Sequence, residues 1–256
     1  MYINNGVLYN VDNDDLNDKG GFTFPEGITT IGAFAFKDCP ELERIAIPYA
    51  IKEIAHDAFI NTALYKNPDN WENGVLYIDD CLIKAKHALP NNYEIKKGTR
   101  VIANFAFAGC QDLEEIIVPD SVTAISTGAF NCCRYLTKIK LPKYLTIIGS
   151  HAFTNCHKLS EVVLPNGITE IGNEAFKHCN RLVNVILPDT VTTIRSSAFH
   201  GCTNLESITV PDTIKHLGNK SFGRCFALDE VIVPNHTIGT TKNLTKEKIL
   251  EFFCRE

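Results

Sequence analysis

The 256-residue sequence lacks several features that mark common functional classes. It contains no run of about 18 apolar residues, so we expect no α-helix long enough to cross a bilayer. Lys and Arg total 25 while Asp and Glu total 30, which leaves a formal net charge of −5. Nucleic acids and anionic membrane surfaces require a basic patch, and we therefore expect neither as a partner.

The first residues also lack a secretory signal, because Met1 leads into YINNGVLYNVDNDD without a basic segment or an apolar stretch. Either the protein is cytoplasmic or this chain lacks its original N-terminus. Catalytic signatures of the forms G-x-x-x-x-G-K-[ST], H-E-x-x-H and G-x-S-x-G are absent. We expect no catalytic residue and no cofactor, and hence a protein that is not an enzyme.

What the sequence does contain is a repeat of 23 residues, most visible in its phenylalanines. The interval between Phe59 and Phe107 is longer, at one period plus 25 inserted residues. The phenylalanine column consists of Phe36, Phe59, Phe107, Phe130, Phe153, Phe176, Phe199 and Phe222. A cysteine column follows three residues later, at Cys39, Cys110, Cys133, Cys156, Cys179, Cys202 and Cys225.

Each repeat continues with leucine, a β-branched residue and proline, as in Leu182, Val185 and Pro188. The LxxIxLP pattern predicts a short strand, and alternation in the next stretch, such as DTVTTI at 189–194, predicts a second extended segment. The small residues around each phenylalanine, as in SSAFHGC at 196–202, favour a tight helical or 3-10 turn. A unit this short cannot bury its own apolar face, so it must stack on its neighbours as a solenoid.

The pattern resembles the BspA-like branch of the leucine-rich repeat superfamily, whose unit reads roughly LxxIxLPxxVTxIGxxAFxxC. The resemblance covers residues 20–60 and 92–234. It implies a leucine-rich repeat solenoid with a parallel β-sheet on its concave face and short strands and 3-10 or helical turns on the other side. It also implies a surface-exposed or extracellular adhesion module that binds host proteins or other cells. An intracellular protein-interaction scaffold is the alternative, favoured by the missing signal and the many thiols.

Segments without the repeat divide the chain further. Residues 1–19 are interpreted as a partial module or cap, 20–234 as the solenoid, and 235–256 as a capping segment with a short helix. Within the solenoid, an insertion at about 66–91 predicts a β-hairpin whose strands are joined by Asp79-Asp80. Tyr93 and Ile95 restore the phase of the repeat, so we expect the hairpin to leave the sheet unbroken. NGVLY occurs at 5–9 and again at 73–77, which suggests that the chain begins with a second copy of the inserted module.

The cysteine column is interpreted as small, buried apolar side chains. Parallel Cα–Cβ vectors do not suit disulfides, and four thiolates in a straight row cannot converge tetrahedrally on zinc. Only Cys132-Cys133, Cys81 and Cys254 remain as candidates for reactive thiols. An enzyme would need a cleft beside the insertion in which Cys81 or His87 lies next to a carboxylate.

The histidines occupy four different phases of the repeat, so stacking should send them in different directions. This leaves no shared metal site. The four in question are His151, His157, His178 and His200.

The candidate binding residues are those that flank the β-branched core residue of each strand, because in leucine-rich repeat proteins they point out of the concave sheet. The column before it is polar: Arg44, Glu115, Lys138, Glu161, Asn184, Ser207 and Glu230. The column after it is unexpectedly apolar: Ala46, Ile117, Lys140, Val163, Ile186, Thr209 and Ile232. An exposed aliphatic patch of this kind marks a binding surface, although β-branched residues are also simply good strand formers. We hypothesise that this face of a monomer binds a protein or another macromolecule.

Overall fold

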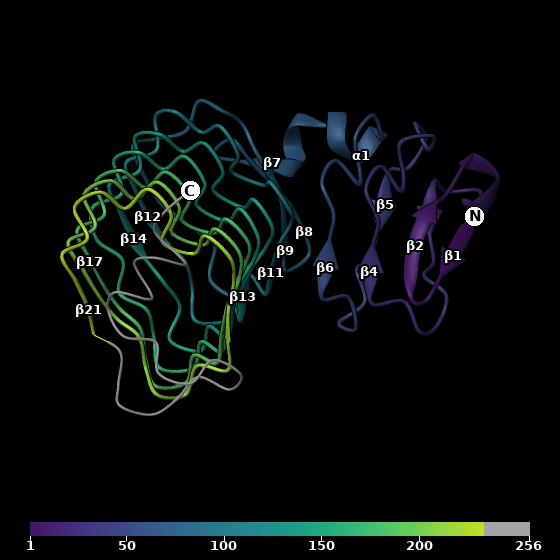
Figure 1. Cartoon of the computed structure of the whole chain (residues 1–256). Helices are drawn as coiled ribbons and strands as arrows, with labels where there is room; N and C mark the ends of the chain where they lie inside the picture. The colour runs from purple at the N-terminus through teal and green to yellow at the C-terminus, as the bar shows by residue number, and fades with distance from the viewer. Residues whose placement is uncertain (233–256) are drawn as a thin grey trace.

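The structure is a computed structural model that describes residues 1–232, so the predicted capping segment 235–256 and Cys254 lie outside the described residues. The chain winds into a solenoid whose successive coils stack side by side (Figure 1). Within residues 1–232 helix is limited to α1 (Ala63–Lys66) and two 3-10 turns, η1 (Asn13–Asp15) and η2 (Pro68–Asn70). The predicted solenoid of short parallel strands is confirmed.

The LxxIxLP segments form one face of the solenoid, called the front sheet below. Its strands are β3 (Gly21–Phe22), β5 (Arg44–Ile45), β10 (Asn92–Glu94), β12 (Glu115–Ile117), β14 (Lys138–Lys140), β17 (Asn184–Ile186), β19 (Ser207–Thr209) and β21 (Glu230–Ile232). Neighbouring strands are parallel, and their register equals the repeat period, so that Glu115 lies opposite Lys138. Equivalent residues of successive repeats therefore stand beside each other.

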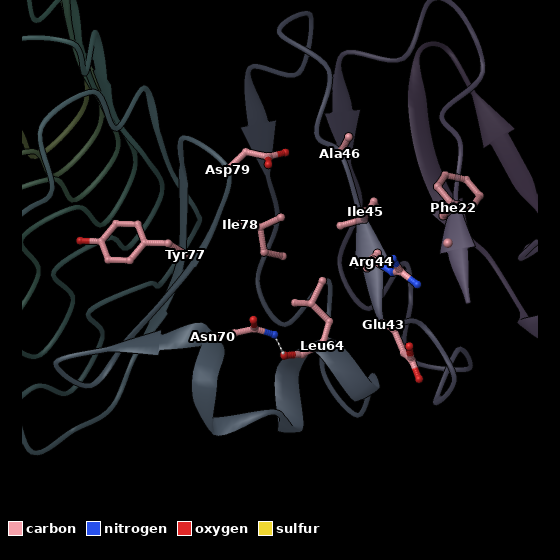
Figure 2. Close-up of a pocket in the computed structure, with 11 residues that line it drawn as sticks. Phe22, Glu43, Arg44, Ile45, Ala46, Leu64, Asn70, Tyr77, Ile78 and Asp79 are labelled. Atoms are coloured by element: carbon pink, nitrogen blue, oxygen red, sulfur yellow. Dashed lines mark hydrogen bonds between the residues drawn. The ribbon is translucent and has the colours of Figure 1, made fainter. Parts of the chain in front are cut away.

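Two breaks divide the front sheet into β3–β5, β10–β12–β14 and β17–β19–β21. The second break lies at residues 161–163, where a single bridge joins Lys138 to Glu161. The first lies at the insertion, so our expectation that the hairpin leaves the sheet unbroken is wrong. The phase of the sequence is restored at β10, but Ile78 and Asp79 lie opposite β5, where the next strand of the array belongs (Figure 2).

The second extended segment of each repeat forms the back sheet, whose strands are two residues long. They are β4 (Thr30–Ile31), β6 (Glu53–Ile54), β11 (Val101–Ile102), β13 (Ala124–Ile125), β15 (Ile147–Ile148), β16 (Glu170–Ile171), β18 (Thr193–Ile194) and β20 (His216–Leu217). The strands from β13 to β20 form one continuous parallel sheet. At the second break of the front sheet, the back sheet still joins the neighbouring coils, because β16 pairs with β18. At the first break the back sheet is divided too, since β6 and β11 belong to separate sheets.

The insertion is a three-stranded antiparallel unit, one strand more than the predicted hairpin. It comprises β7 (Trp71–Glu72), β8 (Val75–Ile78) and β9 (Cys81–Ala85). β9 then pairs in parallel with β11, with Cys81 opposite Val101, so that it acts as a coil of the back sheet. The insertion thereby joins the stack.

The N-terminus forms a related hairpin from β1 (Tyr2–Asn4) and β2 (Val7–Asn10). Both copies of NGVLY turn at Asn-Gly, and φ is positive at Asn5, Gly6, Asn73 and Gly74, as two-residue hairpin loops require. Here β2 itself pairs in parallel with β4. The copies therefore share a turn but join the back sheet through different strands.

The core is built around the phenylalanine column, whose eight rings are completely buried. Adjacent rings stack nearly face to face, with centroids 5.1 Å apart for Phe153 and Phe176 and an interplanar angle of 13°. The stack is interrupted between Phe59 and Phe107, where the insertion intervenes. The hydrophobic core is therefore built between coils, because each repeat contributes one phenylalanine that packs on the phenylalanine of the next repeat.

The turn at each phenylalanine has an unusual backbone. The residue two positions before it has a positive φ throughout: Phe34, Asp57, Phe105, Gly128, His151, Glu174, Ser197 and Lys220. Since Gly128 is the one glycine in this column, the other residues carry a left-handed conformation that costs about 1–2 kcal/mol each. The expected 3-10 or helical turn is a run of hydrogen-bonded turns, because left-handed residues cannot continue a right-handed helix.

Candidate functional site

The outward columns of the front sheet are where the sequence places the binding residues. Glu115, Lys138, Lys140, Glu161 and Asn184 are exposed, and Ser207 and Thr209 are half-buried. The aliphatic members are Ile117, Val163 and Ile186, whose exposed fractions are 40%, 71% and 76%. The side chains of Glu230 and Ile232 lie outside the described part of the structure.

Val163 and Ile186 flank the second break in the front sheet. Among the described residues, no backbone hydrogen bond joins residues 160–164 to 183–187. A groove with a volume of about 430 Å³ opens between these two segments, and Val162, Leu164 and Pro188 also line it. The two most exposed aliphatic side chains of the front sheet therefore border a concave feature rather than a flat strand surface.

The first break is closed on one side by polar contacts from the insertion. Asp79 accepts a hydrogen bond from the Ile47 amide through Oδ2, at 2.8 Å. The equivalent amides of unbroken coils, Ile95 and Val118, donate to the carbonyl of the next strand. A carboxylate thus replaces a backbone carbonyl that the array does not supply here.

Arg100 completes this closure. Its Nε donates to both carboxylate oxygens of Asp80 at 2.8 Å, and its terminal nitrogens donate to the carbonyls of Pro48, at 3.0 Å, and Ile51. The guanidinium also lies over the ring of Tyr49. Sequence reasoning missed Arg100 because a lone arginine in a repeat gives no signal. The Asp-Asp turn, a weak hairpin sequence, was the available hint.

Beside these contacts lies a cavity of about 500 Å³ between the insertion and β3–β5 (Figure 2). Phe22, Arg44 and Ala46 line one side, and Tyr77 and Ile78 the other. Asn70 donates a hydrogen bond to the carbonyl of Leu64 at its lower rim, at 2.8 Å. Neither Cys81 nor His87 lines it, so the cleft that an enzyme would need is not found at this place.

The cysteines of the column form hydrogen bonds in addition to packing as small apolar side chains in the core. The Cys179 thiol is completely buried and donates to the carbonyl of Phe153, one coil earlier, at 3.2 Å. Cys156 and Cys202 make the same contact with Phe130 and Phe176. Burial raises the pKa of the Cys179 thiol well above its ordinary value. These thiols are structural hydrogen-bond donors, unsuited to nucleophilic chemistry.

The off-column Cys81 is also buried, and burial raises the pKa of its thiol to about 12.

His178 and His200 correct our expectation that stacking separates the histidines, because their rings lie 5.9 Å apart. Their phases differ by one residue, and the His178 amide donates to the carbonyl of His200. Within residues 1–232, no group of three or more His, Cys, Asp or Glu side chains is placed to hold a metal ion. No helix in that range is long and apolar enough to span a membrane.

Comparison with known proteins agrees with the sequence pattern. The model of the BspA type leucine rich repeat region matches in six copies, over residues 15–89, 85–205 and 172–248. A search of curated proteins found no match.

Among solved structures, a leucine-rich repeat protein of T. pallidum (TpLRR) is 28% identical, with a TM-score of 0.58 over 68% of this chain and 85% of that one. A leucine-rich repeat protein from Bacteroides ovatus is 30% identical, with a TM-score of 0.53 over 83% of this chain. A leucine rich cell surface protein from Faecalibacterium prausnitzii is 22% identical, with a TM-score of 0.50 over 88% of this chain. The chain spans 55% and 63% of the last two proteins.

Proposed function

Because the chain belongs to the BspA-type leucine-rich repeat family, we propose that it is a non-catalytic module that binds a protein partner through its front sheet. A solenoid of this kind presents a long, regular surface, and its outward columns are free to vary without disturbing the core. The site residues are the two outward columns given above. Arg44 and Ala46 extend them to β5.

The observation that carries this proposal is the exposure of Val163 and Ile186 at the rim of the 430 Å³ groove. Exposed aliphatic side chains that lie next to each other are a feature of surfaces that bind a protein partner. Charged residues of both signs, Glu115, Lys138 and Glu161, are exposed in the neighbouring outward column of the same sheet. An apolar centre with a polar surround is the usual composition of a protein interface.

The proposal that the protein is not an enzyme is supported by the chemistry of its buried nucleophiles. The column thiols are hydrogen-bonded and raised in pKa, so they are poor nucleophiles near neutral pH. Neither Cys81 nor His87 lines the cavity beside the insertion. A binding surface therefore accounts for the exposed features better than a reaction site does.

Replacing Val163 and Ile186 by aspartate tests this function. The proteins that the immobilised chain captures are purified, and their affinity is measured for the native chain and for V163D/I186D. We expect a loss of at least about tenfold, or 1.4 kcal/mol, with nearly unchanged melting because both side chains are exposed. The matched control is Ile147→Asp, an aliphatic residue of the back sheet that is 42% exposed. Equal loss in the control, or undiminished binding by the double variant, would exclude the front sheet.

We further propose a surface-exposed role in adhesion or in contact with host proteins or other cells, which the family resemblance favours. Labelling intact cells of the source organism with a membrane-impermeant amine reagent tests it. Modification of this protein on intact cells is the expected result. Modification only after lysis would contradict surface exposure and favour an intracellular scaffold.

A further inference from the structure

The edge of β5 that points away from β3 faces the cavity at the first break (Figure 2). Backbone groups on this edge have no hydrogen-bond partner among the described residues. The amide of Arg44 points back toward the carbonyl of Gly20, and β5 pairs with β3 alone. Because alternate residues of a strand bond to opposite neighbours, the N–H and C=O of Ile45 point away from β3 and into the cavity. Among the described residues, neither group has a hydrogen-bond partner on that side.

The chain replaces the missing strand on both sides of Ile45 but not at Ile45 itself. On one side the Ile47 amide is held by Asp79, at 2.8 Å. On the other side the carbonyl of Leu42 accepts from the amide of Leu64, also at 2.8 Å. What remains between them is a strand edge with one free donor, the N–H of Ile45, and two free acceptors, the carbonyls of Glu43 and Ile45, beside a cavity of about 500 Å³.

We propose that this edge is a docking site for an extended segment of a partner protein, which adds to β5 as a parallel strand. A polypeptide backbone offers donors and acceptors with the spacing that a strand edge requires, and such strand addition is a general mode of peptide recognition. The unbroken coils show the expected register, since β12 pairs with β10 on the side on which no strand pairs with β5. This proposal is independent of the groove at Val163 and Ile186.

Charge indicates the composition of the segment. Arg44 is exposed and forms no ion pair among the described residues. In its column, neighbouring coils alternate in charge, with Glu115 beside Lys138 and Lys138 beside Glu161. Opposite charges in adjacent strands are mutually stabilising. The occupant therefore carries an acidic residue opposite Arg44 and a β-branched residue opposite Ile45.

A synthetic peptide EEIIVP, the sequence of residues 114–119, is the probe. It reproduces the strand that fills the equivalent place beside β10. Its binding to the full chain is measured by fluorescence polarisation, and amide exchange at Ile45 is followed by NMR. We expect saturable binding and slower exchange of the Ile45 amide. No binding, or binding that leaves exchange at Ile45 unchanged, overturns the proposal.

Modified peptides separate strand pairing from other modes of binding. N-methylation of the second and fourth residues, whose amides would face β5, should abolish binding, because it removes the donors. N-methylation of the third and fifth, whose amides would point away, is the matched control and should have little effect. Equal sensitivity to both modifications overturns strand pairing.

Variants of the protein locate the site. Ala46→Trp fills the cavity and should lower affinity at least threefold, whereas Thr209→Trp, at the equivalent position of an unbroken stretch, should not. Arg44→Glu should weaken binding of EEIIVP, and exchanging the second glutamate of the peptide for lysine should restore it. V163D/I186D should leave peptide binding unchanged, so the two proposals fail separately. If only V163D/I186D lost binding of EEIIVP, the peptide would bind at the groove and not at β5. If the peptide instead disrupted self-association of the chain, its site would be an interface between two copies of the chain.

Discussion

Replacing Arg100 by methionine should uncouple the N-terminal coils from the rest of the solenoid. The arginine side chain is 12% exposed and joins Asp80 to the carbonyls of Pro48 and Ile51 across the first break. Neither the phenylalanine stack nor the front sheet is continuous at this place. Methionine keeps the apolar stem of the side chain and removes its charge and donors.

The magnitude follows from the contacts. Hydrogen bonds to charged groups contribute about 1.5–3 kcal/mol each, but losses within one cluster do not add. Asp80 is 40% exposed and regains water in the variant, which reduces its share. The carbonyls of Pro48 and Ile51 lose a close donor, and the contact with the Tyr49 ring contributes about 0.5 kcal/mol more. We expect the free energy of unfolding to fall by about 3 kcal/mol.

Urea unfolding followed by the fluorescence of Trp71 measures this change where it acts, since Trp71 is the single tryptophan and begins β7 of the insertion. Circular dichroism reports the whole array in parallel. In Arg100→Met the fluorescence transition should move to lower urea and separate from the later loss of strand signal. Arg195→Met is the control, because Arg195 is 46% exposed and, within residues 1–232, pairs only with Glu170, so the loss should stay below about 1 kcal/mol. Coincident transitions and a loss below about 1 kcal/mol in Arg100→Met would refute the reasoning.

Three further predictions concern the turns of the repeat. Cys132 is half-buried and should be alkylated by iodoacetamide in the native protein, whereas the buried, high-pKa thiol of Cys179 should react only after unfolding; mass spectrometry that finds equal native reactivity would contradict the burial argument. Ser197→Gly should raise the free energy of unfolding by about 0.5–1 kcal/mol. The reason is that φ is 56° at Ser197, and glycine adopts this left-handed conformation without strain, although it adds entropy to the unfolded state. A urea titration that finds the variant destabilised would argue against this reason. Burial lowers the pKa of His178 and His200 below the ordinary 6.5, so the folded state binds fewer protons than the unfolded state in acid. Stability should therefore be full above about pH 6.5 and fall below it, and replacing both by asparagine should flatten that fall, with an unchanged pH profile as the contrary result.

Much of the fold could be predicted because every repeat has the same pattern of residues. Eight phenylalanines in phase fix which side chains face the core, and the 23-residue register between strands such as β12 and β14 follows directly. The outward direction of Val163 and Ile186 follows from the same alternation. The role of the cysteines was predicted in part: their burial follows from the column, but the bond to the preceding coil depends on the shape of the turn.

The pairing of strands at the first break could not be predicted from the repeat period. The phase of Tyr93 predicts an unbroken sheet, yet phase records only where the pattern resumes and not which strands meet. The contacts of Asp79 and Arg100 depend on how residues 47–51 fold against the insertion, which no repeated column encodes.

The sequence by itself thus determined the solenoid, its core columns and its register, because an interaction repeated along the chain leaves a period that can be read. Tertiary structure alone decided where the front sheet opens, which groups close the gap, and which edge remains unpaired beside Ile45. These features depend on contacts that no repeat shares, between segments distant in sequence, and such contacts leave no pattern in the order of residues.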